Sequence, residues 1–228
     1  MKVVYGPLEN EAWAAVNNSS VNQVPADAIW PQKLPDGSLE VVMVASKPYG
    51  GALVHCTQPT PVLPDTALPY VGLDLEFFLS EAAVAFLRCL EIDLKVSMLP
   101  APPNGVIANV CDFSSQIELF NGGNLQIDNQ AGTWTDAGSA FGALPVGVWV
   151  PWSSRYLIDA PNSKYSVLSV AVAGVAKKIA AALQGLGYQK TNWAANSETQ
   201  FQLDNNTVPA AMAVQYRNIY QTYSDQPF

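Results

Sequence analysis

Alternation of apolar and polar residues is the feature that most constrains the fold of this chain. The stretches GLDLEFFLS, residues 72–80, and LEIDLKV, residues 90–96, each place an apolar side chain at nearly every second position. Successive side chains of a β-strand point to opposite faces, so this period of two predicts strands with one buried and one polar face. The pattern recurs in residues 115–130, 154–159 and 199–206, and a further strand is expected at residues 213–224.

Strands of this kind follow one another at intervals of about ten residues, separated by turn residues such as the Asn-Gly-Gly of 121–123. This succession predicts an all-β fold, a two-sheet antiparallel β-sandwich of jelly-roll type, with a meander barrel as the alternative. Residues 35–228 are expected to form the sandwich as a single domain overall. Residues 1–34 are expected to pack on it as an N-terminal segment, anchored by Trp13 and Trp30.

Residues 164–187 are compatible with two structures. The alanine-rich stretch that begins at Val175 has the apolar spacing of an amphipathic helix. The preceding residues, YSVLSVAVAG, are rich in strand-forming types and end in an Ala-Gly pair that can close a turn. Because the neighbouring segments are all predicted strands, we expect a β-hairpin whose second strand begins at Val175.

The charge balance excludes two classes of partner. The chain has 11 Lys and Arg against 19 Asp and Glu, a formal net charge of -8, and its basic residues form no run. A phosphate backbone or an anionic membrane surface requires clustered positive charge, so neither nucleic acid nor membrane is expected as a partner. The oligomeric state is not indicated by the sequence.

The sequence gives few signals about location. No apolar run is long enough to span a membrane, and the residues after Met1 reach Gly6, Pro7 and Glu9 before a signal-peptide core could form. The low charged fraction of 13%, with many Asn, Gln, Ser and Thr, suits a secreted or periplasmic protein. A cytoplasmic location is the alternative.

The cysteines and the single histidine limit the available chemistry. Cys56, Cys89 and Cys111 form no C-x-x-C motif, so a structural zinc site is not expected, and buried thiols are favoured over one disulfide with a leftover thiol. His55 excludes a two-histidine metal site, and any histidine-dependent nucleophile would have to use it. A structural or surface role is expected for His55.

The order of these segments resembles the concanavalin A-like lectin/glucanase superfamily, in particular bacterial members that are mostly uncharacterised. The resemblance covers roughly residues 35–224 and rests on five stretches: LPDGSLEVVMVASKPYGGALVHC, LDLEFFLSEAAVAFLRCLEIDLKV, GVWVPWSSRYLID, KYSVLSVAVAGVAKKI and MAVQYRNIYQTYS. It implies the jelly-roll sandwich more strongly than it implies an activity.

Laminarinase-like hydrolases of that superfamily carry a strand with a nucleophilic Glu, an assisting Asp and a final acid/base Glu. Here Glu91 and Asp93 match the first two positions, whereas Lys95 or Val96 stands where the final Glu belongs. Retaining hydrolysis needs two carboxyl groups about 5–5.5 Å apart. If the chain were an enzyme, Glu76, from a strand paired with theirs, or another distant acid would have to complete the site with Glu91 and Asp93.

The resemblance does not support a bound metal. Lectins of the superfamily hold Ca²⁺ and a transition metal through a cluster of acids, an Asn and a His, and no such cluster is present here. Glucanase-like members hold a structural Ca²⁺ with an Asp in the last strand, where this chain has Arg217 or Asn218. No cofactor and no metal site are therefore expected.

The leading hypothesis is a non-catalytic, lectin-like domain that presents a polar and aromatic sheet face to a polysaccharide or other glycan. Sugars stack on Trp and Tyr and hydrogen-bond to carboxylates and amides, and Trp134 and Trp193 lie in polar stretches expected to be loops. The alternatives are a glycoside hydrolase or polysaccharide lyase of the same fold, and a structural or self-assembling sandwich. The candidate ligand-binding residues are Glu76, Glu91, Asp93, Gln126, Asp128 and Trp134.

Overall fold

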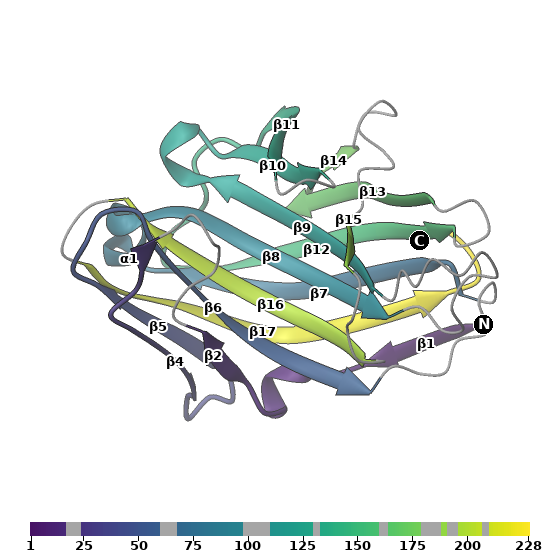
Figure 1. The fold of residues 1–228 in the computed structure, drawn as a ribbon, viewed down its shortest axis with the longest axis horizontal. Helices are drawn as coiled ribbons and strands as arrows, with labels where there is room; N and C mark the ends of the chain where they lie inside the picture. Colours follow the sequence, from purple (N-terminus) through teal and green to yellow (C-terminus); the bar gives the residue numbers. More distant parts are fainter. Residues whose placement is uncertain are drawn as a thin grey trace.

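Two β-sheets lie face to face in the structure, a computed structural model (Figure 1). It describes residues 1–16, 24–59, 68–97, 110–129, 133–159, 164–178, 188–190, 196–206 and 210–228. All strand pairs of the described ranges are antiparallel except one short parallel pair at Val24–Pro25. The predicted all-β, two-sheet sandwich is confirmed.

The first sheet, sheet A, has strand β17 near its centre and β1 paired to one part of it. Its strands in spatial order are β14 (Val175–Lys178), β13 (Lys164–Val172), β12 (Trp149–Asp159), β7 (Tyr70–Leu79), β17 (Ala210–Ser224), β5 (Leu39–Ala45) and β4 (Ala28–Lys33), with β1 (Lys2–Tyr5) on β17.

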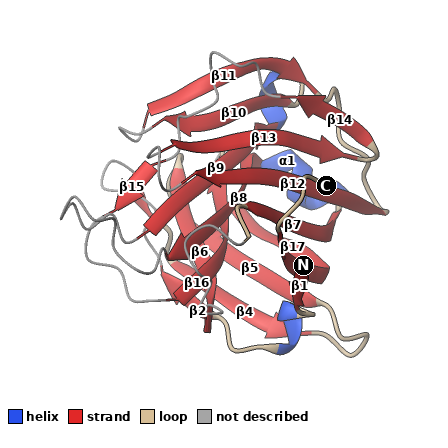
Figure 2. Cartoon of the chain, turned by 90° about the vertical axis from the view of Figure 1, so that its right-hand side faces the viewer, coloured by secondary structure: helices blue, strands red, loops and turns tan. Residues whose placement is uncertain are grey.

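The second sheet, sheet B, has β8 and β16 at its centre. Its strands in spatial order are β11 (Thr133–Ala140), β10 (Asn124–Asn129), β9 (Val110–Glu118), β8 (Leu87–Ser97), β16 (Asn196–Asn205), β6 (Gly50–Pro59) and β2 (Ala14–Val16), with β15 (Tyr188–Lys190) on β9 and β3 (Val24–Pro25) on β6. Figure 2 shows the two layers from the side.

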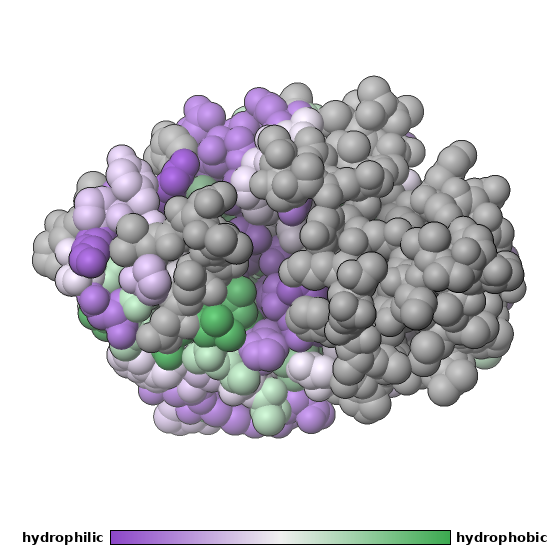
Figure 3. Space-filling view, viewed as in Figure 1, coloured by the Kyte–Doolittle hydropathy of each residue, from purple (hydrophilic) through white to green (hydrophobic). Residues whose placement is uncertain are grey.

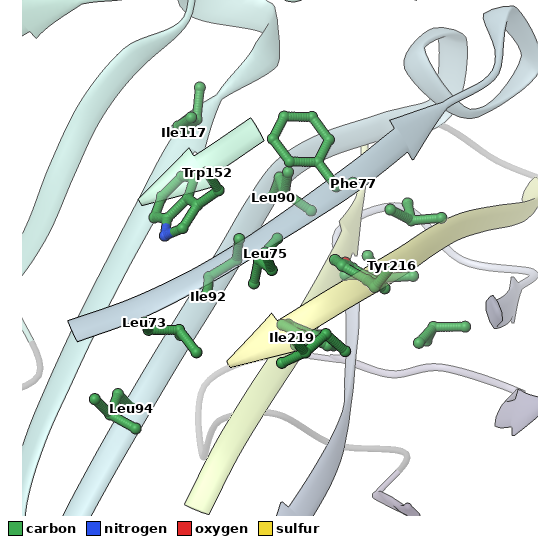
Figure 4. Packing of buried hydrophobic residues seen from close by; sticks show 14 of the residues in the cluster. Leu73, Leu75, Phe77, Leu90, Ile92, Leu94, Ile117, Trp152, Tyr216 and Ile219 are labelled. Carbon is green, nitrogen blue, oxygen red and sulfur yellow. The ribbon is translucent and has the colours of Figure 1, made fainter. Parts of the chain in front are cut away.

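The core lies between the two sheets and is formed by the apolar half of each alternating strand. Leu73 and Phe77 of β7 and Leu90 and Ile92 of β8 are fully buried in one cluster, as the close-up of Figure 4 shows. Burying a side chain of this size stabilises the fold by about 1.5–3 kcal/mol. The polar residues of the same strands are thereby turned to the outer faces of the sandwich.

Strands β7 and β8 follow each other in the chain but belong to opposite sheets. The short helix α1 (Glu81–Phe86) joins them, and Ser80 caps its start, with the Ser80 hydroxyl accepting a hydrogen bond from the Ala83 backbone N–H at 3.0 Å. The chain therefore crosses from sheet A to sheet B at this helix. The other described helices, η1 (Leu8–Asn10) and η2 (Leu119–Asn121), are single turns, and no described helix is long and apolar enough to cross a membrane.

The predicted hairpin at Val175 is confirmed. In the pairing of β13 with β14, Val172 lies opposite Val175 at the turn and Ser169 lies opposite Lys178 at the other end. Ala173 and Gly174 between them both have positive φ, 51° and 77°, as a two-residue turn that matches the twist of a hairpin requires. Residues 179–187 lie outside the described residues.

The N-terminal segment contributes strands to both sheets, and its two tryptophans differ in environment. Trp13 stacks on Phe201 with ring centroids 5.0 Å apart, whereas Trp30 on β4 is 40% exposed. Cys56 and Cys89 carry buried thiols and form no disulfide, and burial raises the pKa of Cys89. The side chain of Cys111 lies outside the described part.

Glu9 of η1 hydrogen-bonds to strand β17 where the pairing of that strand is irregular. The pairing of β17 with β7 shifts between Arg217 and Tyr220, where Asn218 adopts a φ of 53°. The buried Glu9 carboxylate accepts hydrogen bonds from the backbone N–H groups of Asn218, at 2.8 Å, and Ile219, at 3.0 Å. These two donors would otherwise lack their ladder partners.

Replacing Glu9 with Ala is expected to reduce the free energy of unfolding by about 2 kcal/mol, because it leaves two backbone donors without their acceptor. Urea denaturation measures the change. Glu11→Ala, at an exposed position nearby, is the matched control and should change stability by less than about 0.5 kcal/mol. Equal effects of the two substitutions would contradict the role of Glu9.

Candidate functional site

The outward side of sheet B carries a continuous set of polar side chains, called here the polar face. Leu90 and Ile92 of β8 point inward, so their neighbours on β8 point outward. The register then identifies the outward residues of the adjacent strands. The polar face consists of Glu91, Asp93 and Lys95 of β8, Ser114, Gln116 and Glu118 of β9, Gln126 and Asp128 of β10, His55 and Thr57 of β6, and Glu198, Gln200, Gln202 and Asp204 of β16. Figure 3, drawn from the same side as Figure 1, shows hydrophilic residues at the centre of the view.

Carboxylates at the centre of the polar face are flanked by neutral hydrogen-bonding side chains. In the register of sheet B, Glu91 lies between Gln202 of β16 and Gln116 of β9. Asp93 lies between Gln200 and Ser114 in the next row. Neighbours directly across a ladder have Cβ atoms about 4.5–5.5 Å apart, so each carboxylate is within reach of amide or hydroxyl groups.

The glutamines join adjacent positions of the polar face. Gln116 Nε2 donates to Gln126 Oε1 at 2.5 Å, across strands β9 and β10. Gln202 Nε2 donates to Asp204 Oδ1 at 3.2 Å along β16. Gln116, Gln202 and Asp204 are buried, as are Glu91 at 5% and Asp93 at 4% exposure, whereas Gln126 is half-buried. Buried polar groups that are hydrogen-bonded in this way hold their side chains in fixed positions.

A charged cluster surrounds Glu198, which is 2% exposed. Its carboxylate oxygens lie 3.2 Å from His55 Nδ1 and 3.6 Å from Lys95 Nζ. Gln200 joins the cluster because its Oε1 accepts from Lys95 Nζ at 2.6 Å while its Nε2 donates to Glu198. Burial alone would raise the pKa of Glu198, but the hydrogen bond from His55, the charge of Lys95 and the hydrogen bond from Gln200 together lower it.

Glu118 marks the opposite end of the polar face. Its carboxylate accepts hydrogen bonds from Asn121 Nδ2 at 3.1 Å and Asn124 Nδ2 at 3.2 Å, both next to the turn between β9 and β10. Gly123 closes this turn at a φ of 73°, where an added Cβ would lie 2.1 Å from the Gly142 carbonyl oxygen. Only glycine fits this position, which explains the Asn-Gly-Gly signal in the sequence.

Most predicted ligand-binding residues lie on or next to the polar face. Glu91, Asp93, Gln126 and Asp128 project from β8 and β10 on the same side of sheet B. Trp134 is directly opposite Asp128 in the pair of β10 and β11, so it belongs to a strand rather than to the predicted loop. Trp193 lies outside the described residues.

Glu76 does not belong with these residues, and its predicted pairing with Glu91 is wrong. It projects from β7 on the outer side of sheet A, separated from Glu91 by the whole sandwich. Its Oε2 accepts from Arg217 Nε and from Asn218 Nδ2, both at 2.7 Å, and the Arg217 hydrogen bond lowers the pKa of Glu76 despite partial burial. The prediction failed because α1 carries the chain to the other sheet within a few residues.

The main features of the polar face that the sequence did not reveal are the cluster around Glu198 and the glutamines beside Glu91. The alternation of residues 199–206 predicted a strand with Gln200 and Gln202 on one side, but no spacing signal places it beside β8. Among the residues that the structure describes, no three His, Cys, Asp or Glu side chains are grouped as metal ligands would be. The expected absence of a cofactor remains a prediction.

No protein-family model matches the chain, and no curated protein sequence matches it. Among solved structures, a variant of the alginate lyase Aly36B in complex with alginate tetrasaccharide is similar, with 11% identity, a TM-score of 0.51, and coverage of 94% of this chain and 97% of that chain. The β-glucanase of Bacillus licheniformis is also similar, with 11% identity, a TM-score of 0.50, and coverage of 99% and 98%. The chain therefore has the concanavalin A-like sandwich fold that the sequence resemblance implied.

Proposed function

We propose that the polar face of sheet B binds a saccharide chain and does not cleave it. The observation that carries the proposal is the register of three central strands, which places Glu91 between Gln202 and Gln116 and Asp93 between Gln200 and Ser114. Sugar hydroxyl groups both donate and accept hydrogen bonds, so they match a surface where carboxylate acceptors alternate with amides. A sheet holds these groups at fixed spacing, which reduces the ordering cost of binding.

The proposed lack of catalysis follows from the charges of Lys95 and Glu198, which leave no carboxyl proton donor at this position. A glycoside hydrolase needs one carboxyl group with a raised pKa that can protonate the leaving oxygen. Lys95 stands where the resemblance would place that acid, and the pKa of the neighbouring Glu198 is lowered, which keeps its carboxylate ionised. The polar face is therefore better suited to holding a glycan than to transferring a proton to it.

The comparisons support a saccharide ligand only through the fold. The two solved structures are named for an alginate lyase with a bound alginate tetrasaccharide and for a β-glucanase. Their sugars differ in charge, and at 11% identity neither sugar can be transferred to this chain. The ligand must therefore be inferred from the residues of the polar face.

The test is a glycan array followed by calorimetry with the oligosaccharides that bind. Glu91→Gln is expected to weaken binding by about tenfold or more, because a hydrogen bond to a charged group is replaced by one to a neutral group. Glu76→Gln, a matched change on the outer side of sheet A, should leave affinity unchanged. Absence of binding to every glycan tested would refute the proposal.

The non-catalytic part is tested separately with the same glycans. Incubation with the protein is expected to release no reducing ends and no unsaturated products. Product release that disappears in the Glu91→Gln protein would show a hydrolase or lyase instead.

A further inference from the structure

We infer that the ligand of the polar face is an uncharged saccharide chain and that chains of uronic acids or sulfated sugars are rejected. The inference rests on the proposed function and specifies the ligand class of the same site. It follows from where the acidic and basic residues of the chain are placed.

The five central strands of sheet B are rich in acids and poor in bases. Their basic residues are Arg88 and Lys95, both on β8. Their acidic residues are Glu91, Asp93, Asp112, Glu118, Asp128, Glu198 and Asp204. Acidic residues therefore outnumber basic ones on these strands, which disfavours an anionic ligand.

Neither basic residue is placed to receive a ligand carboxylate beside Glu91 or Asp93. Lys95 Nζ already lies 2.6 Å from Gln200 Oε1 and 3.6 Å from Glu198 Oε1. The Arg88 guanidinium carbon lies 5.5 Å from the centroid of the Tyr49 ring. Arg88 lies at the start of β8, beside Leu87, where the pairing of β8 with β16 shifts register.

The two central rows of the polar face contain no Lys or Arg. The row of Glu91 continues through Gln202 to Leu53 on one side and through Gln116 to Gln126 on the other. The row of Asp93 contains Gln200, His55 and Ser114. His55 Nδ1 is directed at Glu198, 3.2 Å away.

Most other basic residues lie away from these strands: seven are on strands of sheet A, and Lys47 lies between β5 and β6. Lys190 on β15 pairs in register with Val110, at the end of β9 that lies farthest from Glu118. By sequence alone, the segments outside the described residues contain no Lys or Arg. No further basic side chain from those segments is available to neutralise a bound anion.

An uncharged sugar suits this surface for a second reason. A carboxylate accepts hydrogen bonds and does not donate them, so sugar hydroxyls suit Glu91 and Asp93 as donors. Every hydroxyl of a neutral sugar can donate. A uronate carboxylate is itself only an acceptor, and like charges brought together in a desolvated interface strongly oppose binding.

The test compares neutral and anionic oligosaccharides of equal length by calorimetry on the full chain at neutral pH. The neutral probes are oligomers of β-glucan and mannan, and the anionic probes are oligomers of alginate and polygalacturonate. Neutral oligomers are expected to bind at least about 100-fold more tightly than anionic ones in about 20 mM NaCl, and the ratio should shrink in about 500 mM NaCl. The affinity for neutral oligomers should not depend on salt.

The outcomes separate the two proposals. Alginate or polygalacturonate binding as tightly as the neutral oligomers would overturn the ligand class and leave saccharide binding in place. If the protein bound neither the probes nor any other glycan, the proposed function would be overturned, and this inference with it. The paired change Glu91→Gln with Asp93→Asn should reduce the discrimination against anionic oligomers, and the salt series on the unchanged protein tests the inference if that variant does not fold.

Discussion

Lys95→Met is expected to destabilise the protein by about 3–5 kcal/mol at neutral pH, because it removes the charged partner of a carboxylate that stays buried. Lys95 Nζ lies 3.6 Å from Glu198 Oε1, and the two side chains are only 6% and 2% exposed. Methionine preserves most of the apolar stem of lysine, so the loss of charge dominates the effect. Urea denaturation followed by far-ultraviolet circular dichroism measures it.

The pH dependence identifies Glu198 as the origin of this effect. Although burial by itself raises the pKa of Glu198, its polar partners lower it below the ordinary value in the folded protein. An acid whose folded pKa is lowered stabilises the fold above its unfolded pKa, about 4.3, and loses that contribution as the pH falls through the folded pKa. Without Lys95 the pKa of Glu198 should rise, so the difference between the two proteins should be greatest at neutral pH and decrease as the pH falls.

Two controls separate charge from packing. Lys2→Met, at an exposed position, should change stability by less than about 0.5 kcal/mol. Adding Glu198→Gln to Lys95→Met should recover part of the lost stability, because the buried group is then neutral. A Lys95→Met effect that is the same at every pH would contradict the electrostatic explanation.

The strands could be predicted from the sequence because burial on one face imposes the period of two on each of them separately. The hairpin at Ala173 and Gly174 could be predicted as well, since its turn and its strand propensity are local properties. The partner of each strand could not. Residues 72–80 and 90–96 have the same pattern and lie close in sequence, yet α1 places them in opposite sheets.

The polar face shows the same limit. Glu91 and Asp93 were predicted as candidates because they share one side of one strand. Gln202 and Gln200 lie opposite them on a strand about a hundred residues later, in a register that is set by packing of the inward residues. Trp134 was assigned to a loop because its neighbours are glycines and small polar residues, although pairing with β10 makes that stretch a strand.

The second large prediction concerns Phe201 of β16, one of the inward-pointing residues that pack between the sheets. Its ring lies between those of Tyr216 in sheet A, with centroids 3.9 Å apart, and Trp13 in the N-terminal segment, with centroids 5.0 Å apart. Phe201 is fully buried. Phe201→Ala is therefore expected to reduce the free energy of unfolding by about 3–5 kcal/mol, through lost burial and the cavity that remains between the sheets.

The same substitution connects packing to the polar face. Phe201 lies between Gln200 and Gln202 on β16, so a cavity beneath it should loosen the side chains that flank Glu91 and Asp93. Saccharide affinity of the folded Phe201→Ala protein should fall at a temperature well below its melting point. Trp30 is a large aromatic residue that is 40% exposed, so Trp30→Ala is the matched control. It should change stability and saccharide affinity little. If Phe201→Ala lowered stability but left affinity intact, the positions of Gln200 and Gln202 would have to be fixed by the ladder hydrogen bonds of β16 alone, because the packing beneath them would have been removed.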